Sequence, residues 1–223
     1  MNKINIIKTL WFNFKMFPLS QAIKFPILLY GKINFNRLSG KIKLESPICR
    51  RMMMIGAHGS EMFSNTTCTI DIAGKVVIKG KDIRLGCGSL IRVEKNGQII
   101  FYENSIIGAN SMVFSETEIV IHENVITSWN CQIMDTDTHS IKDLLTNKIM
   151  PRTKPVIINK NCWIGNHVII NKGTILPNGT IVCANSLCNK NYNHLANIQT
   201  NILIGGIPAK IISTNKQRLY DKL

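Results

Sequence analysis

A repeat of six residues dominates the C-terminal half of the chain and restricts its fold more than any other feature. Large aliphatic residues recur at every sixth position, and a smaller residue stands two positions before each; the aliphatic positions are Ile158, Ile164, Ile170, Leu176 and Val182. An α-helix has a period of about 3.6 residues and a plain strand a period of about two, so neither explains the spacing. A coil with three flat faces, one face for every six residues, does explain it.

Such a coil buries each face only against the turns above and below it. The residue after each large aliphatic then lies at a corner, where glycine is tolerated best and asparagine next. Gly165, Asn159 and Asn171 occupy this position. Cys162 stands at a small inward position, where a thiol serves as a compact apolar filler.

Weaker signals extend the coil toward the N-terminus. Apolar stretches separated by glycines begin near residue 50, and a six-residue step runs from Phe101 to Ile119 and resumes at Ile121. The step fails between residues 134 and 155, where the sequence is polar. A loop expelled from a regular coil costs little stability and is where chemistry tends to lie. We therefore expect a coil over residues 49–212 with an expelled loop near 134–155.

Residues 1–48 lack the repeat and mix aromatic side chains with lysines. Residues 1–51 carry ten basic side chains against Glu45, which is +9 of the net charge of +14. No recognised nucleic-acid-binding module accompanies this charge, so we do not expect nucleic acid as a partner. Because repeat coils need covered ends, we expect a cap with a short helix that starts near Ser20 and ends before Pro26. A peripheral membrane contact through residues 1–35 is the alternative.

The remaining features concern the C-terminus and the cellular compartment. Residues 213–223 predict a short C-terminal helix, with Thr214 or Asn215 as its cap. The seven cysteines show no zinc-like spacing, so we expect no metal. Free cysteines fit a reducing cytoplasm, and we find neither a signal peptide nor an apolar run near the ~20 residues of a membrane span. We expect a cytoplasmic protein, with the inner face of a membrane as the alternative place.

The expelled loop opens with Asp135-Thr-Asp137-Thr-His139. A histidine can take a proton from a hydroxyl near neutral pH, and a carboxylate can fix its tautomer. The pattern does not choose between Asp135 and Asp137 as that carboxylate. The three side chains also resemble part of a metal cluster, but the spacing provides no further ligands. His139 lies six residues after Ile133, so it could instead be the last inward residue of that row.

Four segments occur in a fixed order along the chain: SWNCQIMDTDTH, KPVIINKNCWIGNHVIINKGTI, VCANSLCNK and GGIPAK. The series resembles the O-acetyltransferase branch of the hexapeptide-repeat acyltransferase superfamily, which includes galactoside and maltose acetyltransferases and acyltransferases of surface-polysaccharide clusters. The resemblance is specific over residues 121–212 and weaker over 50–110. It implies an all-β, left-handed parallel β-helix and a homotrimer whose sites are shared between adjacent subunits.

The resemblance also implies a reaction and a set of site residues. The reaction would transfer acetyl from acetyl-CoA to a hydroxyl of a sugar, in a capsule, lipopolysaccharide or other surface glycan. The general base would be His139, and Trp129 and Asn130 would line the acceptor side. Lysine ammonium groups would meet the phosphates of coenzyme A. The residues implied in cofactor binding are Trp163, Gly165, Ala184, Ser186, Lys190, Pro208 and Lys210.

Some features leave other interpretations open. The superfamily usually has glycine after the stacking aliphatic, but Asn159, Asn171, Pro177 and Cys183 stand there in this chain. Cys131 beside the loop would suggest an acyl-cysteine, against which the direct transfer of the superfamily argues. Two other functions are an acetyltransferase for a nucleotide amino sugar, serine or a xenobiotic, and a non-catalytic β-helix that binds or scaffolds. The sequence does not identify the sugar or the hydroxyl.

Overall fold

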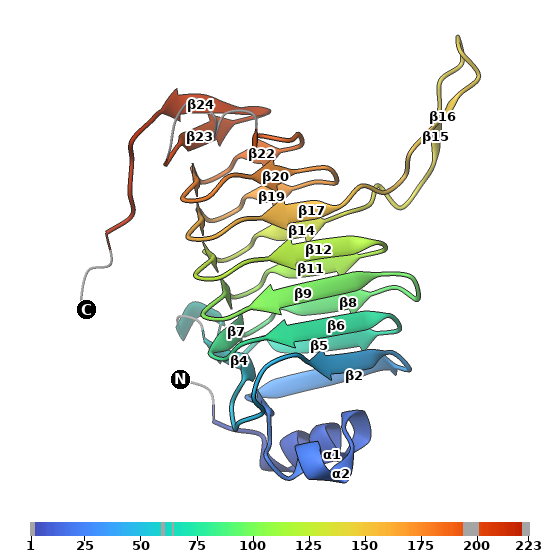
Figure 1. Cartoon of the computed structure of the whole chain (residues 1–223), viewed down its shortest axis with the longest axis vertical. Helices are drawn as coiled ribbons and strands as arrows, with labels where there is room; N and C mark the ends of the chain where they lie inside the picture. Colours follow the sequence, from blue (N-terminus) through green and yellow to red (C-terminus); the bar gives the residue numbers. More distant parts are fainter. Residues whose placement is uncertain (1–2, 59–60, 64, 194–200, 220–223) are drawn as a thin grey trace.

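The computed structural model describes residues 3–58, 61–63, 65–193 and 201–219, and its strands build one tall coil (Figure 1). Each turn contributes a short strand to three sheets, and within each sheet these strands pair in parallel with the turns above and below. Strands of the near sheet, such as β6, β9 and β12, run to the left as the chain climbs, so the coil is left-handed (Figure 1). The predicted left-handed parallel β-helix is therefore confirmed.

The three sheets form the three faces of the coil. The first sheet contains β1 (Ile27–Leu29), β4 (Met53–His58), β7 (Ile83–Gly86), β10 (Ile106–Ile107), β13 (Ile126–Thr127), β18 (Trp163–Ile164), β21 (Ile181–Val182), β23 (Leu203–Gly206) and β24 (Ala209–Ser213). The second contains β2 (Lys32–Leu38), β5 (Thr67–Ile72), β8 (Leu90–Val93), β11 (Met112–Ser115), β14 (Gln132–Met134), β19 (Ile169–Ile170) and β22 (Leu187–Cys188). The third contains β3 (Lys41–Leu44), β6 (Lys75–Lys79), β9 (Gln98–Tyr102), β12 (Glu118–Ile121), β17 (Val156–Ile158) and β20 (Ile175–Leu176). A short 3-10 helix spans Glu61–Phe63.

The six-residue repeat places one large aliphatic side chain inside the coil on each face. Ile158 lies on the third sheet, Ile164 on the first and Ile170 on the second, so three repeats complete one turn. One turn later, Leu176 pairs with Ile158 and Val182 pairs with Ile164. All five side chains are buried. The core of the coil is therefore a set of stacked aliphatic columns.

The corners have two separate requirements, which the sequence analysis merged into one. Left-handed backbone occurs three residues after each aliphatic, as at Asn161 (φ 60°) and His167 (φ 58°), and not directly after it as predicted for Asn159 and Asn171. The position directly after the aliphatic instead lies close to the next turn. A Cβ on Gly165 would lie 2.6 Å from the backbone nitrogen of Ala184.

The coil begins earlier than predicted. The strands β1, β2 and β3 pair in parallel with β4, β5 and β6, so the first turn already starts at Ile27. The predicted boundary at residue 49 is therefore wrong. The strands of this turn are longer than those of the regular repeat, and exposed lysines such as Lys41 and Lys43 alternate with their apolar residues, which hides the period of six.

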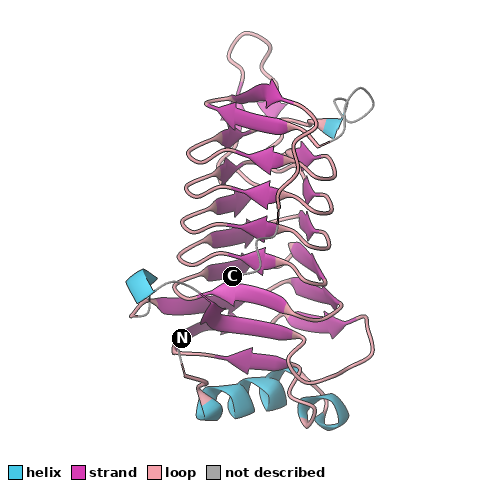
Figure 2. Cartoon of the chain, turned by 90° about the vertical axis from the view of Figure 1, so that its left-hand side faces the viewer, coloured by secondary structure: helices cyan, strands magenta, loops and turns pink. Residues whose placement is uncertain are grey.

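Two helices cover the open lower end of the coil, α1 (Ile6–Met16) and α2 (Leu19–Ala22) (Figure 2). The side chain of Asn5 caps α1 by accepting a hydrogen bond from the Lys8 backbone N–H at 3.1 Å. The predicted short helix is present as α2, with Pro18 rather than Ser20 at its start, whereas the sequence analysis did not locate α1. None of the helices in the described residues is long and apolar enough to cross a membrane.

The upper end is closed by a hairpin and not by the predicted C-terminal helix. β24 turns back and pairs antiparallel with β23, and the tail after it runs down beside the coil (Figures 1 and 2). Residues 214–219 are not helical, and residues 220–223 lie outside the described residues. The backbone N–H of Lys216 donates to the carbonyl of Asn201 at 2.9 Å, so the tail satisfies its backbone against the coil. The prediction of a helix over 213–223 is wrong for the residues that can be seen.

The expelled loop lies between β14 and β17. Its middle is an antiparallel hairpin of β15 (Ile141–Lys142) and β16 (Ile149–Met150), which projects away from the coil (Figure 1). We call residues 140–151 the arm. The tip of the arm exposes Leu144 and Leu145 almost completely, at 86% and 97%.

We predict that Gly86→Ala destabilises the coil by about 1–3 kcal/mol, the usual cost of overpacking. A Cβ on Gly86 would lie 2.6 Å from Cα of Ala109 and 2.8 Å from the carbonyl carbon of Gly108. Ser128 occupies the equivalent corner two turns higher and already carries a side chain, so Ser128→Ala is the matched control and should stay within about 0.5 kcal/mol. Chemical denaturation of the two variants measures both effects, and equal unfolding free energies would contradict the close-approach argument.

Candidate functional site

The base of the expelled loop is held by a buried carboxylate. Asp135 is fully buried, directly after β14. Its oxygens accept hydrogen bonds from the Ser115 hydroxyl (2.8 Å), from the backbone N–H of Glu116 (2.8 Å) and from the backbone N–H of Thr117 (2.9 Å), with the Thr117 hydroxyl at 3.2 Å. These donors form the corner between the second and third sheets one turn below. Asp135 therefore fixes the point at which the chain leaves the coil.

The other side of the loop base is closed by ion pairs. Arg152 Nη2 lies 2.6 Å from Glu116 Oε2, and Arg152 accepts a backbone hydrogen bond from Asp137 at 3.0 Å. The exposed carboxylate of Asp137 pairs with the ammonium of Lys172. The outgoing and returning segments of the loop are thus joined to each other at the base of the arm.

His139 follows this base on the outgoing side of the loop. Its side chain is exposed, and Thr138 before it adopts a left-handed turn (φ 63°). The alternative that His139 is an inward member of the Ile133 row is therefore wrong. Among the described residues, neither Asp135 nor Asp137 forms a hydrogen bond or ion pair with the imidazole. Within one chain, Asp135 is engaged by the coil and Asp137 by Lys172.

The residues expected to bind the cofactor lie on another side of the coil. Trp163 begins β18 on the first sheet. Gly165 and Ala184 lie on adjacent turns and contact each other at the corner between the first and second sheets. Ser186 is buried, and its hydroxyl accepts a hydrogen bond from the Gly206 backbone N–H at 3.1 Å. Ala184 and Asn185 are exposed at this corner, and His167 is exposed one turn below.

Arg218 is a residue that the sequence analysis did not single out. Its guanidinium lies over the Trp163 ring, 5.3 Å from the ring centroid, because the C-terminal tail runs down the first sheet (Figure 2). The sequence analysis predicted a helix over residues 213–223 and therefore did not predict this contact. The tail is thus part of the surface around Trp163.

The segment from Gly206 to Lys210 forms the turn of the β23–β24 hairpin. Gly206 pairs with Ala209 and Gly205 pairs with Lys210, which leaves Pro208 and Lys210 exposed at the top of the coil. Lys190 is also exposed, and its ammonium lies over the Tyr192 ring at 5.3 Å.

Trp129 and Asn130 lie at the corner between the first and second sheets. The Asn130 side chain accepts from Asn110 Nδ2 at 2.6 Å, and its own Nδ2 lies 3.2 Å from His167 Nε2. Asn130 has left-handed backbone (φ 57°), so it serves as a corner residue as well as a candidate contact. Trp129 beside it is 40% exposed. His167 was not predicted, although its place three residues after Ile164 marks it as a corner residue.

One chain does not bring these groups together. The loop with His139 leaves between the second and third sheets, whereas Trp163 lies on the first sheet and Ala184 at its corner with the second. His139 and most of the cofactor candidates thus lie on different sides of the same coil. Lys190 is the exception, since it follows β22 at the corner between the second and third sheets.

Cys131 lies near the loop but is not a reactive thiol. Its side chain is buried, and burial raises the pKa of the thiol to about 11. A thiol with this pKa stays protonated at neutral pH and is a poor nucleophile.

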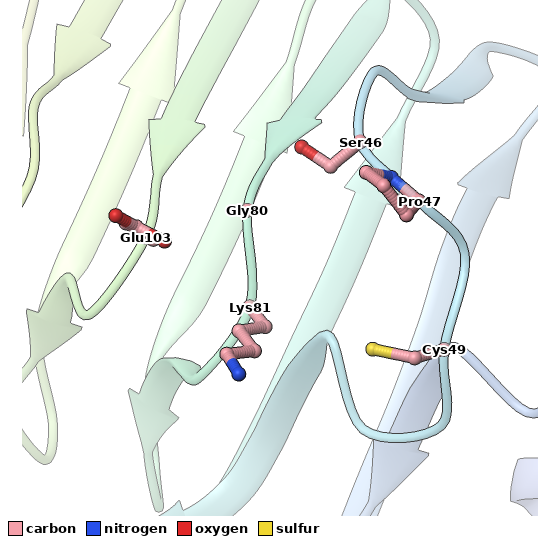
Figure 3. A pocket seen from close by; sticks show the side chains of 6 residues that line it. All are labelled: Ser46, Pro47, Cys49, Gly80, Lys81 and Glu103. Carbon is pink, nitrogen blue, oxygen red and sulfur yellow. The ribbon is translucent and has the colours of Figure 1, made fainter.

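A hollow on the lower turns carries none of the predicted residues. It is lined by Ser46, Pro47, Cys49, Gly80, Lys81 and Glu103, from the corners between the third and first sheets (Figure 3). In the described part of the chain, no three His, Cys, Asp or Glu side chains are grouped to hold a metal ion.

Sequence comparison finds relatives among O-acetyltransferases, although no protein-family profile matches the chain. A protein of Escherichia coli K12 named as an O-acetyl transferase of lipopolysaccharide biosynthesis, WbbJ, is 26% identical over 153 residues, which cover 64% of this chain and 75% of the relative. The galactoside O-acetyltransferase of the same organism is 27% identical over 56% of this chain, and the chain spans about half (54%) of its length. The solved structure of the polysialic acid O-acetyltransferase OatWY aligns with a TM-score of 0.47 at 20% identity, over 86% of this chain and 94% of that one. The sequence relatives confirm the resemblance predicted from the motifs.

We predict that Asp135→Asn destabilises the protein by at least about 2 kcal/mol, because hydrogen bonds to a charged group contribute about 1.5–3 kcal/mol each. The new amide NH₂ would also face backbone donors. Asp137→Asn is the matched control, since its ion pair is partly exposed and should contribute about 1 kcal/mol or less. Thermal and chemical unfolding of the two variants test this, and an Asp135→Asn protein as stable as wild type would contradict the anchoring role.

Proposed function

We propose that this chain, a relative of bacterial O-acetyltransferases, transfers an acetyl group from acetyl-CoA to a hydroxyl of a sugar in a surface glycan. The observation that carries the proposal is His139, exposed on a loop whose base is held by buried Asp135. A histidine that has no hydrogen-bond or ion-pair partner among the described residues, and that is placed on an ordered base, can serve an external hydroxyl. The acceptor class is supported by the relative named for lipopolysaccharide biosynthesis.

The reaction would proceed in one ternary complex. An imidazole nitrogen of His139 takes the proton from the sugar hydroxyl, and the oxygen attacks the thioester carbonyl of acetyl-CoA. The tetrahedral intermediate then expels the thiolate of coenzyme A, which takes the proton back from the imidazolium. The high pKa of Cys131 supports this direct transfer over an acyl-cysteine intermediate.

Two carboxylates are candidates to orient His139. Asp135 is fully occupied by Ser115, Glu116 and Thr117, so its role within a chain is to position the loop. Asp137 has a partly exposed carboxylate, held by Lys172, and is the better candidate for the imidazole.

The cofactor would bind along the corner that carries Trp163, Gly165, Ala184 and Ser186. Backbone groups at this corner suit the amides of pantetheine, and the exposed ammonium groups of Lys190 and Lys210 suit phosphates, with Pro208 beside them. Arg218 lies over Trp163 and adds a further cation at the same surface. Trp129 and Asn130 would face the acceptor.

A homotrimer would complete the site. His139 and most of the cofactor residues lie on different sides of one coil, so a neighbouring copy must supply one set to the other. The arm supports the same conclusion, since Ile141, Leu144, Leu145 and Ile149 are each more than half exposed. Exposed apolar side chains in such numbers mark an interaction surface.

The cytoplasm is the compartment that suits this activity. Acetyl-CoA is a cytoplasmic substrate for the synthesis of glycan precursors, and all seven cysteines are free.

We expect His139→Ala to lower kcat by roughly 10²- to 10⁴-fold, the usual contribution of a positioned base. The side chain is exposed, so the melting temperature and the affinity for acetyl-CoA should stay near wild type. Labelled acetyl-CoA and glycan precursors from the cell, with calorimetry for binding, provide the three readouts. His122→Ala is the control for a histidine outside the proposed site. A His139→Ala enzyme that folds, binds acetyl-CoA and transfers acetyl at the original rate would refute the mechanism.

We expect the wild-type chain to be trimeric, and Leu144→Asp/Leu145→Asp to dissociate it, because two carboxylates at the arm tip would have to be desolvated in the interface. The tip is fully exposed in one chain, so the fold of the monomer should survive. Light scattering at micromolar concentration measures the mass, and circular dichroism checks the fold. A wild-type chain that is monomeric, or a double variant that stays trimeric and active, would argue against the shared site.

A further inference from the structure

The helix α1, which caps the coil, buries Phe12 but also two polar residues on its inner face, and its outer face is mainly apolar. Thr9 and Asn13, two polar residues, point from α1 into the protein and are buried. Five apolar side chains of the same helix are 41–80% exposed: Ile6, Ile7, Leu10, Trp11 and Phe14. At these spacings they form one stripe along the outer face of α1.

The inward polar residues have a structural reason. β1 is the first strand of its sheet, so one of its edges has no strand to pair with. Asn13 donates to the Ile27 carbonyl at 2.7 Å and accepts from the Ile27 N–H at 3.2 Å, and Thr9 accepts from the Leu29 N–H at 3.1 Å. The edge of the coil thus explains the polar residues but does not explain why the outer face is apolar.

The exposed apolar surface continues beyond α1. Leu19 of α2 is 68% exposed and Ile23 after it is 57% exposed. Both helices lie beneath the first turn, at the end of the coil (Figures 1 and 2). We call the outer surface of residues 6–23 the basal face.

The segment that forms the basal face carries charge of a single sign. Lys3, Lys15 and Lys24 are exposed, and the first acidic residue of the whole chain is Glu45. A second copy that docked on this face would bring like charges together, which opposes self-association. An apolar helix face with tryptophan, flanked by lysines, is the composition of a helix that lies in the interface of an anionic membrane.

We propose that the basal face docks the protein on an anionic membrane surface. The stripe of α1 enters the boundary between headgroups and acyl chains, and Trp11 lies at that boundary. Lys3, Lys15 and Lys24 remain with the lipid phosphates. The coil then stands with its N-terminal end on the membrane, and the proposal holds whichever acceptor the enzyme acetylates.

The test is co-sedimentation of the full chain with vesicles of phosphatidylcholine, with and without phosphatidylglycerol. Binding is expected only with phosphatidylglycerol, and it should weaken as salt is raised. The emission of wild type should shift to the blue on binding, and Trp11→Phe should bind but lose most of that shift. Lys15→Gln/Lys24→Gln should lower binding by about tenfold or more, since each lysine near such a surface contributes on the order of a factor of five.

Ile7→Gln/Leu10→Gln removes apolar side chains from the stripe and should abolish binding. Ile211→Gln/Ile212→Gln changes two apolar side chains that are 40% and 60% exposed at the upper end of the coil, and it is the matched control, which should bind as wild type does. Circular dichroism and melting temperature verify that each variant is folded.

Failure to bind anionic vesicles, binding that ignores both salt and lipid charge, or undiminished binding by folded Ile7→Gln/Leu10→Gln would each overturn the proposal. A larger oligomer in solution that this double variant breaks down would assign the basal face to a second copy instead, which also overturns it.

Discussion

Stacking of identical positions along the coil axis is the constraint on which the rest of this structure depends. Each turn contributes only two to four residues per face in the upper coil, too few to form a core by themselves. The buried columns through Ile158 and Leu176, and through Ile164 and Val182, supply the core jointly with the backbone pairing between turns. Because the turns lie about 4.8 Å apart, the corners must also stack closely. This is why a glycine or a small residue recurs directly after the inward residue of the first sheet, as at Gly86, Gly108 and Gly165.

The expelled loop interrupts the regular coil without disturbing the stacked columns of buried side chains. Asp135 achieves this by satisfying the backbone donors of the corner below and by marking the residue at which the loop departs. Ile133 before it and Val156 after it both remain buried in the columns. The loop can therefore vary in sequence while the turns on either side keep their register. The buried carboxylate that holds the loop is engaged by the corner below it and forms no hydrogen bond or ion pair with the imidazole of His139 among the described residues.

The regular part of the fold could be predicted from sequence because one period, repeated without error from Val156 to Cys188, has only one common structural explanation. The first turn could not be predicted in this way. Lys41 and Lys43 alternate with half-buried residues, and this alternation is typical of an ordinary strand. The C-terminal tail was mistaken for a helix because Thr214 and Asn215 look like caps, while the hydrogen bond from Lys216 to Asn201 depends on a distant turn. The candidate site residues came one by one from the motifs, and the resemblance implied a site shared between adjacent subunits. The six-residue period by itself does not say on which face an expelled loop leaves.

The constant rise of the coil also makes it a spacer of defined length. β14, where the loop departs, lies four turns above β2 in the second sheet. Four turns correspond to about 19 Å of height, and a helix beneath them adds about 10 Å. Any flat surface under α1 therefore lies roughly 30 Å below the base of the loop, too far for a side chain to span. A molecule attached to that surface would meet His139 only if it were long enough to extend alongside four turns. The number of turns would therefore set the minimum length of an acceptor.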